Sequence, residues 1–213
     1  MGAFTLNGKV IIIAGYLASG KSTFARQLSA EISVPYLVKD TFKTALCESV
    51  VISNREDSSL YSAVTFDGMM YVTERLIETG HPIIIEGNFV PKGMIKVDEA
   101  GVISTLLEKY SCQSLTYRFM GDTQTLYERY IEREKSPDRG AANRDFTEVP
   151  FDKFNRYCRN LDDFCVGGKI VDIDTTDFKN VDFKSHFETA RLFIGSNGDL
   201  SATLCKAKPP AIL

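Results

Sequence analysis

The sequence has no tryptophan and few of the residues that hold metal ions or disulfide frameworks, with two histidines and five cysteines among 213 residues. His81 and His186 stand alone, and no two cysteines form a Cys-x-x-Cys pair. Zinc sites usually group cysteines and histidines at short spacings, and small secreted domains usually pair their cysteines. Neither kind of protein is therefore expected.

Long apolar runs are missing as well. The longest one near the N-terminus covers only residues 10–14, whereas a membrane span needs roughly 20 apolar residues. The sequence also lacks a surplus of positive charge, because its formal net charge is −3. These absences predict a soluble cytoplasmic protein without membrane contacts, and they argue against nucleic acid as a partner.

The residues that are present favour one globular α/β domain. Residues 9–14 and 82–87 contain apolar runs without alternation, which are typical of strands buried on both faces of a parallel sheet. Because helical and strand patterns alternate along the chain, we expect ligands at the carboxyl ends of the strands. The other predicted strands are 36–40, 114–120 and 169–173, and the predicted helices are 21–32, 41–52, 59–79, 99–110 and 123–134.

Residues 15–22 read Gly-Tyr-Leu-Ala-Ser-Gly-Lys-Ser and match the phosphate-binding pattern G-x-x-x-x-G-K-[ST]. Between a buried strand and a helix, the backbone N–H groups of such a loop surround the phosphates of a nucleotide. Lys21 is expected to reach the β- and γ-phosphates, and the Ser22 hydroxyl to bind magnesium. The predicted cofactors are therefore ATP and Mg²⁺, and the predicted binding residues in this loop are Gly15, Ala18, Ser19, Gly20, Lys21, Ser22 and Thr23.

Two carboxylates, Asp40 and Glu86, lie at the ends of predicted strands, beside the phosphate loop. Asp40 is expected to take the proton of an attacking hydroxyl, while Lys43, one helical turn further on, holds the acceptor. Glu86 is expected to hold magnesium, directly or through water, or to bind the acceptor. Alternatively, Asp40 caps the next helix, Lys43 is a solvated surface charge and Glu86 is an exposed acid at the sheet edge.

Arginines cluster in and after the predicted helix 123–134. Arg133 and Arg139 are expected to contact the phosphates and stabilise the transition state, and Arg129 to stack on the base. Thr175 and Thr176 follow the last predicted strand and are expected to line the base site. The alternatives are a solvated helix in which glutamates offset the arginines, and a simple capping turn at the threonines.

These motifs resemble a group of P-loop kinases that contains polynucleotide 5′-hydroxyl kinase, chloramphenicol phosphotransferase and the zeta toxins. The resemblance covers roughly residues 8–178. Residues 15–23 resemble the phosphate loop of the group, and residues 40–43 are similar to its D-x-x-R stretch, with Lys43 in place of arginine. Residues 85–87 resemble an acidic strand end of the zeta toxins, with Asn88 in place of threonine, and the arginine series resembles the lid.

The resemblance implies a three-layer P-loop fold with a mostly parallel five-stranded sheet of order 2-3-1-4-5. It implies one kinase domain over residues 1–194, with an acceptor-binding helical segment at about 41–81 and a lid at about 129–150. Residues 195–213 form a tail to which no role is assigned. The implied activity is ATP-dependent transfer of the γ-phosphoryl group to a hydroxyl group of a small molecule.

Two other functions stay open at this point. The protein could be a nucleotide-dependent regulatory switch without transferase activity, although the sequence has no Asn-Lys-x-Asp motif for guanine recognition. Alternatively, the acceptor is a nucleotide or the 5′-hydroxyl end of a nucleic acid, which the negative net charge disfavours for a polymer.

Overall fold

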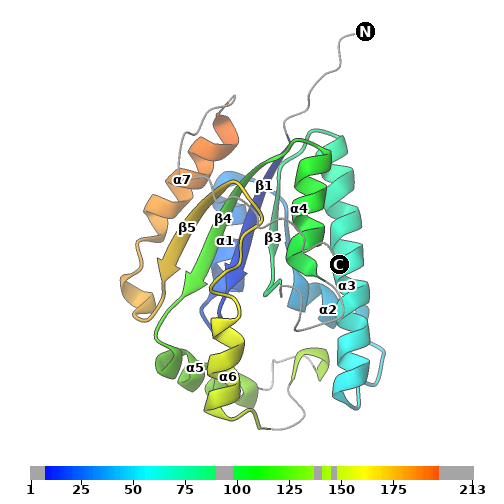
Figure 1. The fold of residues 1–213 in the computed structure, drawn as a ribbon, viewed down its shortest axis with the longest axis vertical. Helices are drawn as coiled ribbons and strands as arrows, with labels where there is room; N and C mark the ends of the chain where they lie inside the picture. The colour runs from blue at the N-terminus through cyan, green and yellow to red at the C-terminus, as the bar shows by residue number, and fades with distance from the viewer. Residues whose placement is uncertain (1–7, 90–97, 137–140, 145–147, 197–213) are drawn as a thin grey trace, which may run out of the picture.

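The fold is built on one parallel sheet of five strands (Figure 1). A computed structural model describes residues 8–89, 98–136, 141–144 and 148–196. The strand order is β2-β3-β1-β4-β5, and every neighbouring pair is parallel, which confirms the predicted fold class and order. The strands are β1 (Lys9–Gly15), β2 (Tyr36–Val38), β3 (Ile83–Glu86), β4 (Gln113–Met120) and β5 (Lys169–Asp174).

Helices cover both faces of the sheet. On one face lie α1 (Lys21–Ile32) and α7 (Phe183–Gly195), and on the other lie α3 (Arg55–Glu78) and α4 (Glu99–Lys109). No helix among the described residues has the length and apolar character of a membrane span. The shorter helices are α2 (Lys39–Leu46), α5 (Thr123–Lys135), η1 (Ala141–Asn143), α6 (Phe151–Arg159) and η2 (Phe178–Asn180).

The central strand β1 explains why its sequence is apolar without alternation. Ile11 and Ile13 pack against α1 and α7, whereas Val10 and Ile12 pack against α3 and α4. All four side chains are at most 1% exposed, because successive residues of a strand face opposite sides of the sheet and both sides are covered. The strand therefore delivers the loop that follows it to a fixed place at the carboxyl edge.

Several element boundaries differ from the prediction. Strand β2 ends at residue 38 rather than 40, and α2 begins at residue 39 rather than 41, so Asp40 lies in the first turn of this helix. Helix α2 ends at Leu46 rather than at residue 52, because Ser49 and the β-branched residues that follow it are poor helix formers. Helix α3 begins earlier than predicted, at residue 55, because the Asn54 side chain accepts a 2.9 Å hydrogen bond from the backbone N–H of Asp57 and caps the first turn.

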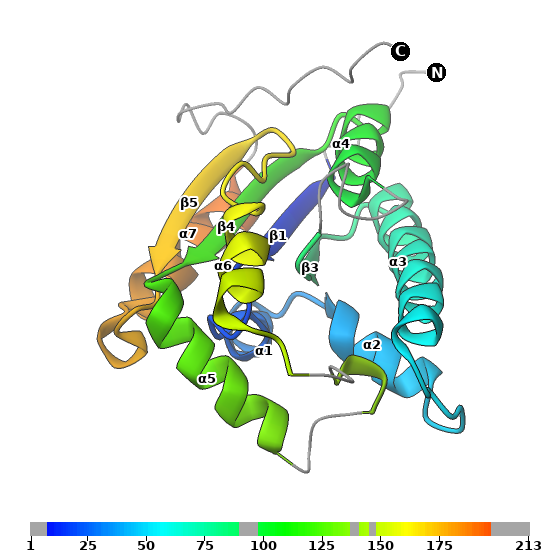
Figure 2. The same cartoon turned by 60° about the horizontal axis from the view of Figure 1, so that its bottom comes forward.

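Helices α6 and α7 were not predicted. Both carry an apolar stripe at helical spacing: Phe154 and Cys158 in α6, and Phe183, Phe187 and Ala190 in α7. Helix α6 packs against α5 at the carboxyl end of the sheet, and α7 completes the layer beside α1. Figure 2 turns this end forward and shows α2, α5 and α6 there.

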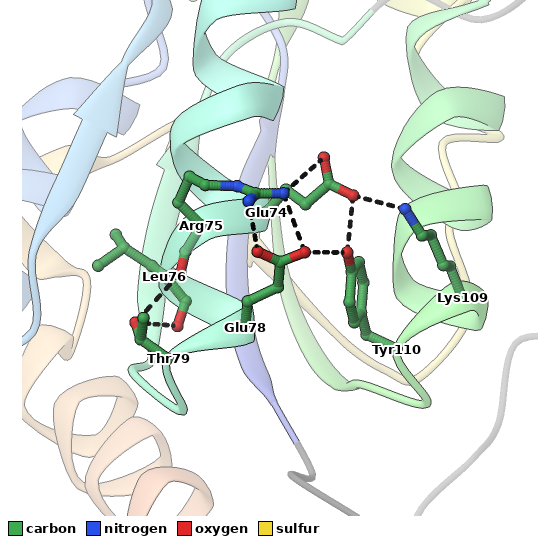
Figure 3. A network of polar contacts seen from close by, with 7 residues as sticks. All are labelled: Glu74, Arg75, Leu76, Glu78, Thr79, Lys109 and Tyr110. Carbon is green, nitrogen blue, oxygen red and sulfur yellow. Dashed lines mark hydrogen bonds and ion pairs between the residues drawn. The ribbon is translucent and has the colours of Figure 1, made fainter.

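A polar network on the surface holds α3 against α4 (Figure 3). The Glu74 carboxylate accepts hydrogen bonds of 2.7 Å from the Lys109 ammonium and 2.8 Å from the Tyr110 hydroxyl. Glu78 forms a 2.7 Å ion pair with Arg75 and lies 2.6 Å from the same hydroxyl. The network lies far along the helices from the carboxyl edge of the sheet, so it offers a control surface away from the candidate site.

Candidate active site

The loop after β1 has the backbone conformation that a phosphate cradle needs. Gly15 and Gly20 have positive φ angles of 120° and 88°, and Ala18 lies in the left-handed region at 56°. Gly20 also caps the start of α1, which directs the positive end of the helix dipole at the loop. A Cβ at Gly20 would lie 2.1 Å from the Phe178 ring, so a larger residue would have to displace this ring as well as adopt a left-handed backbone.

Lys21 is buried within this loop. Its ammonium donates a hydrogen bond to the Tyr16 carbonyl, and the Ser19 hydroxyl donates one of 2.7 Å to the same oxygen. Burial lowers the pKa of Lys21, the Glu86 carboxylate counteracts this and the Arg133 charge adds to it. The ammonium is therefore held inside the loop, and the charges that act on it include Glu86 and Arg133, which are both predicted site residues.

Ser22 and Glu86 meet beside Lys21. The Ser22 hydroxyl donates a 3.0 Å hydrogen bond to Oε2 of Glu86, which is only 4% exposed. Burial raises the pKa of Glu86 to about 7; the Asp40 charge raises it further, whereas Lys21 and the Ser22 hydrogen bond counteract the rise. The alternative of an exposed acid at the sheet edge is wrong. A hydroxyl and a carboxylate side by side are oxygen ligands that suit magnesium.

The sheet register explains how Asp40 comes close to Glu86. Val38 at the end of β2 pairs with Glu86 at the end of β3, so the first turn of α2 starts at the same edge. Asp40 is exposed, and its charge acts on both Glu86 and Lys21. Val38, not Asp40, is the N-cap of α2, so the capping alternative is wrong as well.

Lys43 lies one turn further along α2 and is 6% exposed, so it is not a solvated surface charge. Its ammonium donates a 2.7 Å hydrogen bond to the Ser58 hydroxyl of α3, which in turn donates one of 3.1 Å to the Ala142 carbonyl. Through these hydrogen bonds Lys43 links α2 to α3 and η1. Its contact with an acceptor stays a prediction.

Arg129 holds the loop after β5. Its guanidinium donates hydrogen bonds of 2.6 Å to the Thr175 carbonyl and 2.7 Å to the Thr176 carbonyl. Thr175 is buried and donates from its hydroxyl to the Met120 carbonyl at 3.0 Å, while the Thr176 hydroxyl donates to Asp174 at 2.6 Å. The structure thus brings these three predicted residues together, whereas stacking of Arg129 on a base stays a prediction.

Arg133 lies on α5 with its guanidinium 5.6 Å from the centre of the Tyr130 ring. Its charge lowers the pKa of both Lys21 and Glu86, so it acts on the phosphate loop. Arg139 lies outside the described residues. Thr23 follows Ser22 in the first turn of α1, as the motif requires.

Sequence reasoning missed three polar residues near Asp40. Lys39 and Glu99 are both buried and form an ion pair. Burial raises the pKa of Tyr157 of α6, and the nearby charges of Glu99 and Asp40 raise it further. The apolar stripe of α6 could have placed Tyr157 on a helix. Nothing in the sequence pairs Lys39 with Glu99, since 60 residues separate them.

A family model described as AAA domain matches residues 10–163, which is well over half of the chain. The chain belongs to this AAA domain family. The match begins in β1 and includes the phosphate loop, Asp40, Glu86 and the arginine segment. It confirms the resemblance to P-loop kinases that the sequence motifs carry.

Solved structures show how widely this AAA domain protein shares its fold. A provisionally assigned kinase from Chloroflexus aurantiacus j-10-fl is 21% identical over 88% of this chain and 98% of its own, with a TM-score of 0.77. A sugar kinase from Janibacter sp. HTCC2649 is 13% identical over 88% and 94%, with a TM-score of 0.52. A chain of the Pnkp1/Rnl/Hen1 RNA repair complex is 17% identical over 72% and 44%, with a TM-score of 0.50. No curated protein matches the sequence.

Proposed function

We propose that this protein is a magnesium- and ATP-dependent kinase that transfers the γ-phosphoryl group to a hydroxyl group of a small molecule. The observation that carries the proposal is the position of Asp40. Its carboxylate is exposed, yet its charge acts on Lys21 and Glu86 at the phosphate loop. A solvent-accessible carboxylate there is suited to receive the proton of an incoming hydroxyl.

The proposed reaction assigns each group one task. The acceptor oxygen attacks the γ-phosphorus as Asp40 takes its proton, and the bond between the γ-phosphorus and the β–γ bridging oxygen breaks, so that ADP leaves. Lys21 and Arg133 stabilise the charge that develops on the transferred phosphoryl group. Arg139 is proposed to assist Arg133, and Arg129 to contact the base.

The donor set beside Lys21 fits magnesium. The Ser22 hydroxyl and the Glu86 carboxylate lie 3.0 Å apart and face each other, so both oxygens can turn to one cation or to a water that it holds. When bound, magnesium neutralises charge on the β- and γ-phosphates. Ser22 and Glu86 hold the cation there, and Glu86 does so only as a carboxylate.

A small acceptor agrees best with the surroundings of Asp40. Asp40 lies on α2, which packs against α3, and a hydrogen bond between Lys43 and Ser58 joins the two helices. These groups can bind a few hydroxyl or carboxylate oxygens, but the net charge of −3 gives no general attraction to a polyanion. The sugar kinase among the structural neighbours supports a sugar or polyol as the first class of acceptor to test.

The RNA repair complex among the structural neighbours favours a second candidate function, phosphorylation of a 5′-hydroxyl nucleic-acid end. This candidate shares Asp40, Lys21 and Glu86 with the first and differs only in the acceptor. Binding of a polymer at this site would need a local basic surface and would weaken steeply with salt.

An acceptor screen tests the proposal. The protein is incubated with magnesium and γ-labelled ATP against a panel of monosaccharides, sugar acids, polyols and nucleosides, and separately against a 5′-hydroxyl RNA oligonucleotide. We expect label on a small molecule and none on the oligonucleotide. Label on the oligonucleotide alone would establish the second candidate. Tight nucleotide binding with no labelled acceptor would instead favour a regulatory switch.

Magnesium-dependent nucleotide binding is expected to strengthen as the pH rises from 6 to 8. The pKa of Glu86 lies at about 7, so its carboxylate fraction increases across this range. Because a metal ligand must be deprotonated, the affinity should rise about tenfold. Isothermal titration calorimetry measures the affinity, and Glu86→Gln corrects for protons bound by the nucleotide itself. Equal pH dependence in both proteins would exclude Glu86 from the metal site.

A further inference from the structure

The first residues of α2 and α4 form an ion pair inside the protein. Lys39 opens α2 and Glu99 opens α4, and the Lys39 ammonium donates a hydrogen bond to Oε1 of Glu99. Their side chains are only 11% and 2% exposed. The two helices follow β2 and β3 along the chain, so the pair links two helix starts at one edge of the sheet.

Lys39 contacts a third helix as well. Its ammonium lies 5.5 Å from the centre of the Phe66 ring of α3, within the range of a cation–π interaction. Its Cβ lies 3.3 Å from the position that a Cβ at Gly87 would occupy, next to the end of β3. Lys39 is therefore enclosed by α3, α4 and the residues that follow Glu86.

Helix α2 begins without a side-chain cap. Its N-cap, Val38, makes no side-chain hydrogen bond, whereas side-chain caps begin α3, α4, α5 and α7. The pairing of Val38 with Glu86 fixes the strand end, and the Lys39–Glu99 ion pair fixes the first helical residue. Asp40 comes next in the chain, so these two contacts help to set its position, together with the 2.7 Å hydrogen bond that the Asn143 side chain donates to its carbonyl.

Stability alone does not explain this pair. Burying two charges costs about as much as their attraction returns, and apolar residues of similar volume are often equally stable in their place. An ion pair does, however, fix the relative orientation of the two side chains, because the ammonium must lie against the carboxylate. Glu99 and Asp40 also share a neighbour, since both charges act on Tyr157.

We propose that Lys39 and Glu99 form a positioning pair that sets the place of Asp40 relative to the phosphate loop. The inference rests on the proposed function, because it concerns the alignment of the base with the γ-phosphoryl group. The pair touches neither nucleotide nor acceptor in this assignment. It acts through the first turn of α2, where a displacement of about 1 Å can cost up to ~100-fold in rate.

The test replaces both charges at once, with Lys39→Met and Glu99→Leu in one chain, so that no buried charge loses its compensation. We expect kcat to fall at least about tenfold, with the KM for the acceptor and the Kd for magnesium–ATP little changed. Lys39→Arg, which keeps the pair, should retain most of the activity. Hydrogen exchange at the amides of residues 40–46 should accelerate in the double variant and stay normal in Lys39→Arg.

The matched control removes the exposed pair of Glu74 and Lys109, which joins α3 and α4 far from the loop (Figure 3). Glu74→Leu with Lys109→Met should leave kcat and the exchange of α2 unchanged. An unchanged kcat and unchanged exchange in the Lys39–Glu99 double variant would overturn the positioning role. If the wild-type protein transfers no phosphoryl group at all, the proposed function fails, while the exchange measurement still decides whether the pair fixes α2.

Discussion

Asp40→Asn is expected to lower kcat by about 10²- to 10⁴-fold, the usual contribution of a general base. Asparagine keeps the size of the side chain but cannot take the proton of the attacking hydroxyl. Because Asp40 is exposed and asparagine has nearly the same size and shape, the fold should tolerate the change. The measurements are kcat with the acceptor found in the screen and the Kd for magnesium–ATP, which should stay within about twofold.

The control for this variant is Asp67→Asn, which makes the same acid-to-amide change at an exposed position of α3. It should leave both kcat and Kd unchanged. If Asp40→Asn transfers the phosphoryl group as fast as the wild type while it still binds nucleotide, then Asp40 is not the base. A loss of nucleotide binding in Asp40→Asn would point instead to a role in holding the phosphates or the metal.

The sheet and the phosphate loop were predictable because each depends on local sequence. A β-branched run such as Ile11 to Ile13 is typical of a strand that is covered on both faces, and the structure buries all of it. The loop pattern fixes the spacing of Gly15, Gly20 and Lys21, and the φ angles of the two glycines follow from it. Strand ends beside the loop then indicated Asp40 and Glu86.

The surroundings of those carboxylates were not predictable, because they depend on contacts between distant segments. Lys43 is buried only because α3 and η1 pack over it. Lys39 finds Glu99 only once α4 has packed on the sheet. A lysine or glutamate on a helix is exposed far more often than it is buried, so composition alone favours the wrong assignment at all three positions.

Some errors came from signals that were present in the sequence. The stripe of Phe154 and Cys158 indicates a helix, and the absence of a strong cap or glycine signal does not exclude one. The end of α2 at Leu46 had no such signal, because helix propensity falls only gradually through the residues that follow. Helix existence was therefore recoverable from the sequence, whereas this helix end was not.

Gly15→Ala is expected to reduce the free energy of unfolding by at least about 4 kcal/mol, through backbone strain together with a steric clash. Gly15 has a φ of 120°, and a Cβ there would lie 2.0 Å from the carbonyl oxygen and 2.7 Å from the nitrogen of Phe119. Phe119 cannot retreat, because β4 pairs with β1 on one side and with β5 on the other. Thermal unfolding should show a Tm lower by roughly 10 °C or more.

Gly167→Ala separates the two causes, because Gly167 has a φ of 89° but no atom lies within 4 Å of a Cβ built on it. This control carries only the cost of the left-handed backbone, about 1–2 kcal/mol. Gly15→Ala should be much less stable than the control. Magnesium–ATP should also raise the Tm of Gly15→Ala less than that of the wild type. The reason is that the Tyr16 N–H donates a 2.8 Å hydrogen bond to the Phe119 carbonyl, so a shift at Phe119 also displaces the phosphate loop. If the two variants were equally stable, the close approach of β1 to β4 would not be what requires glycine at position 15.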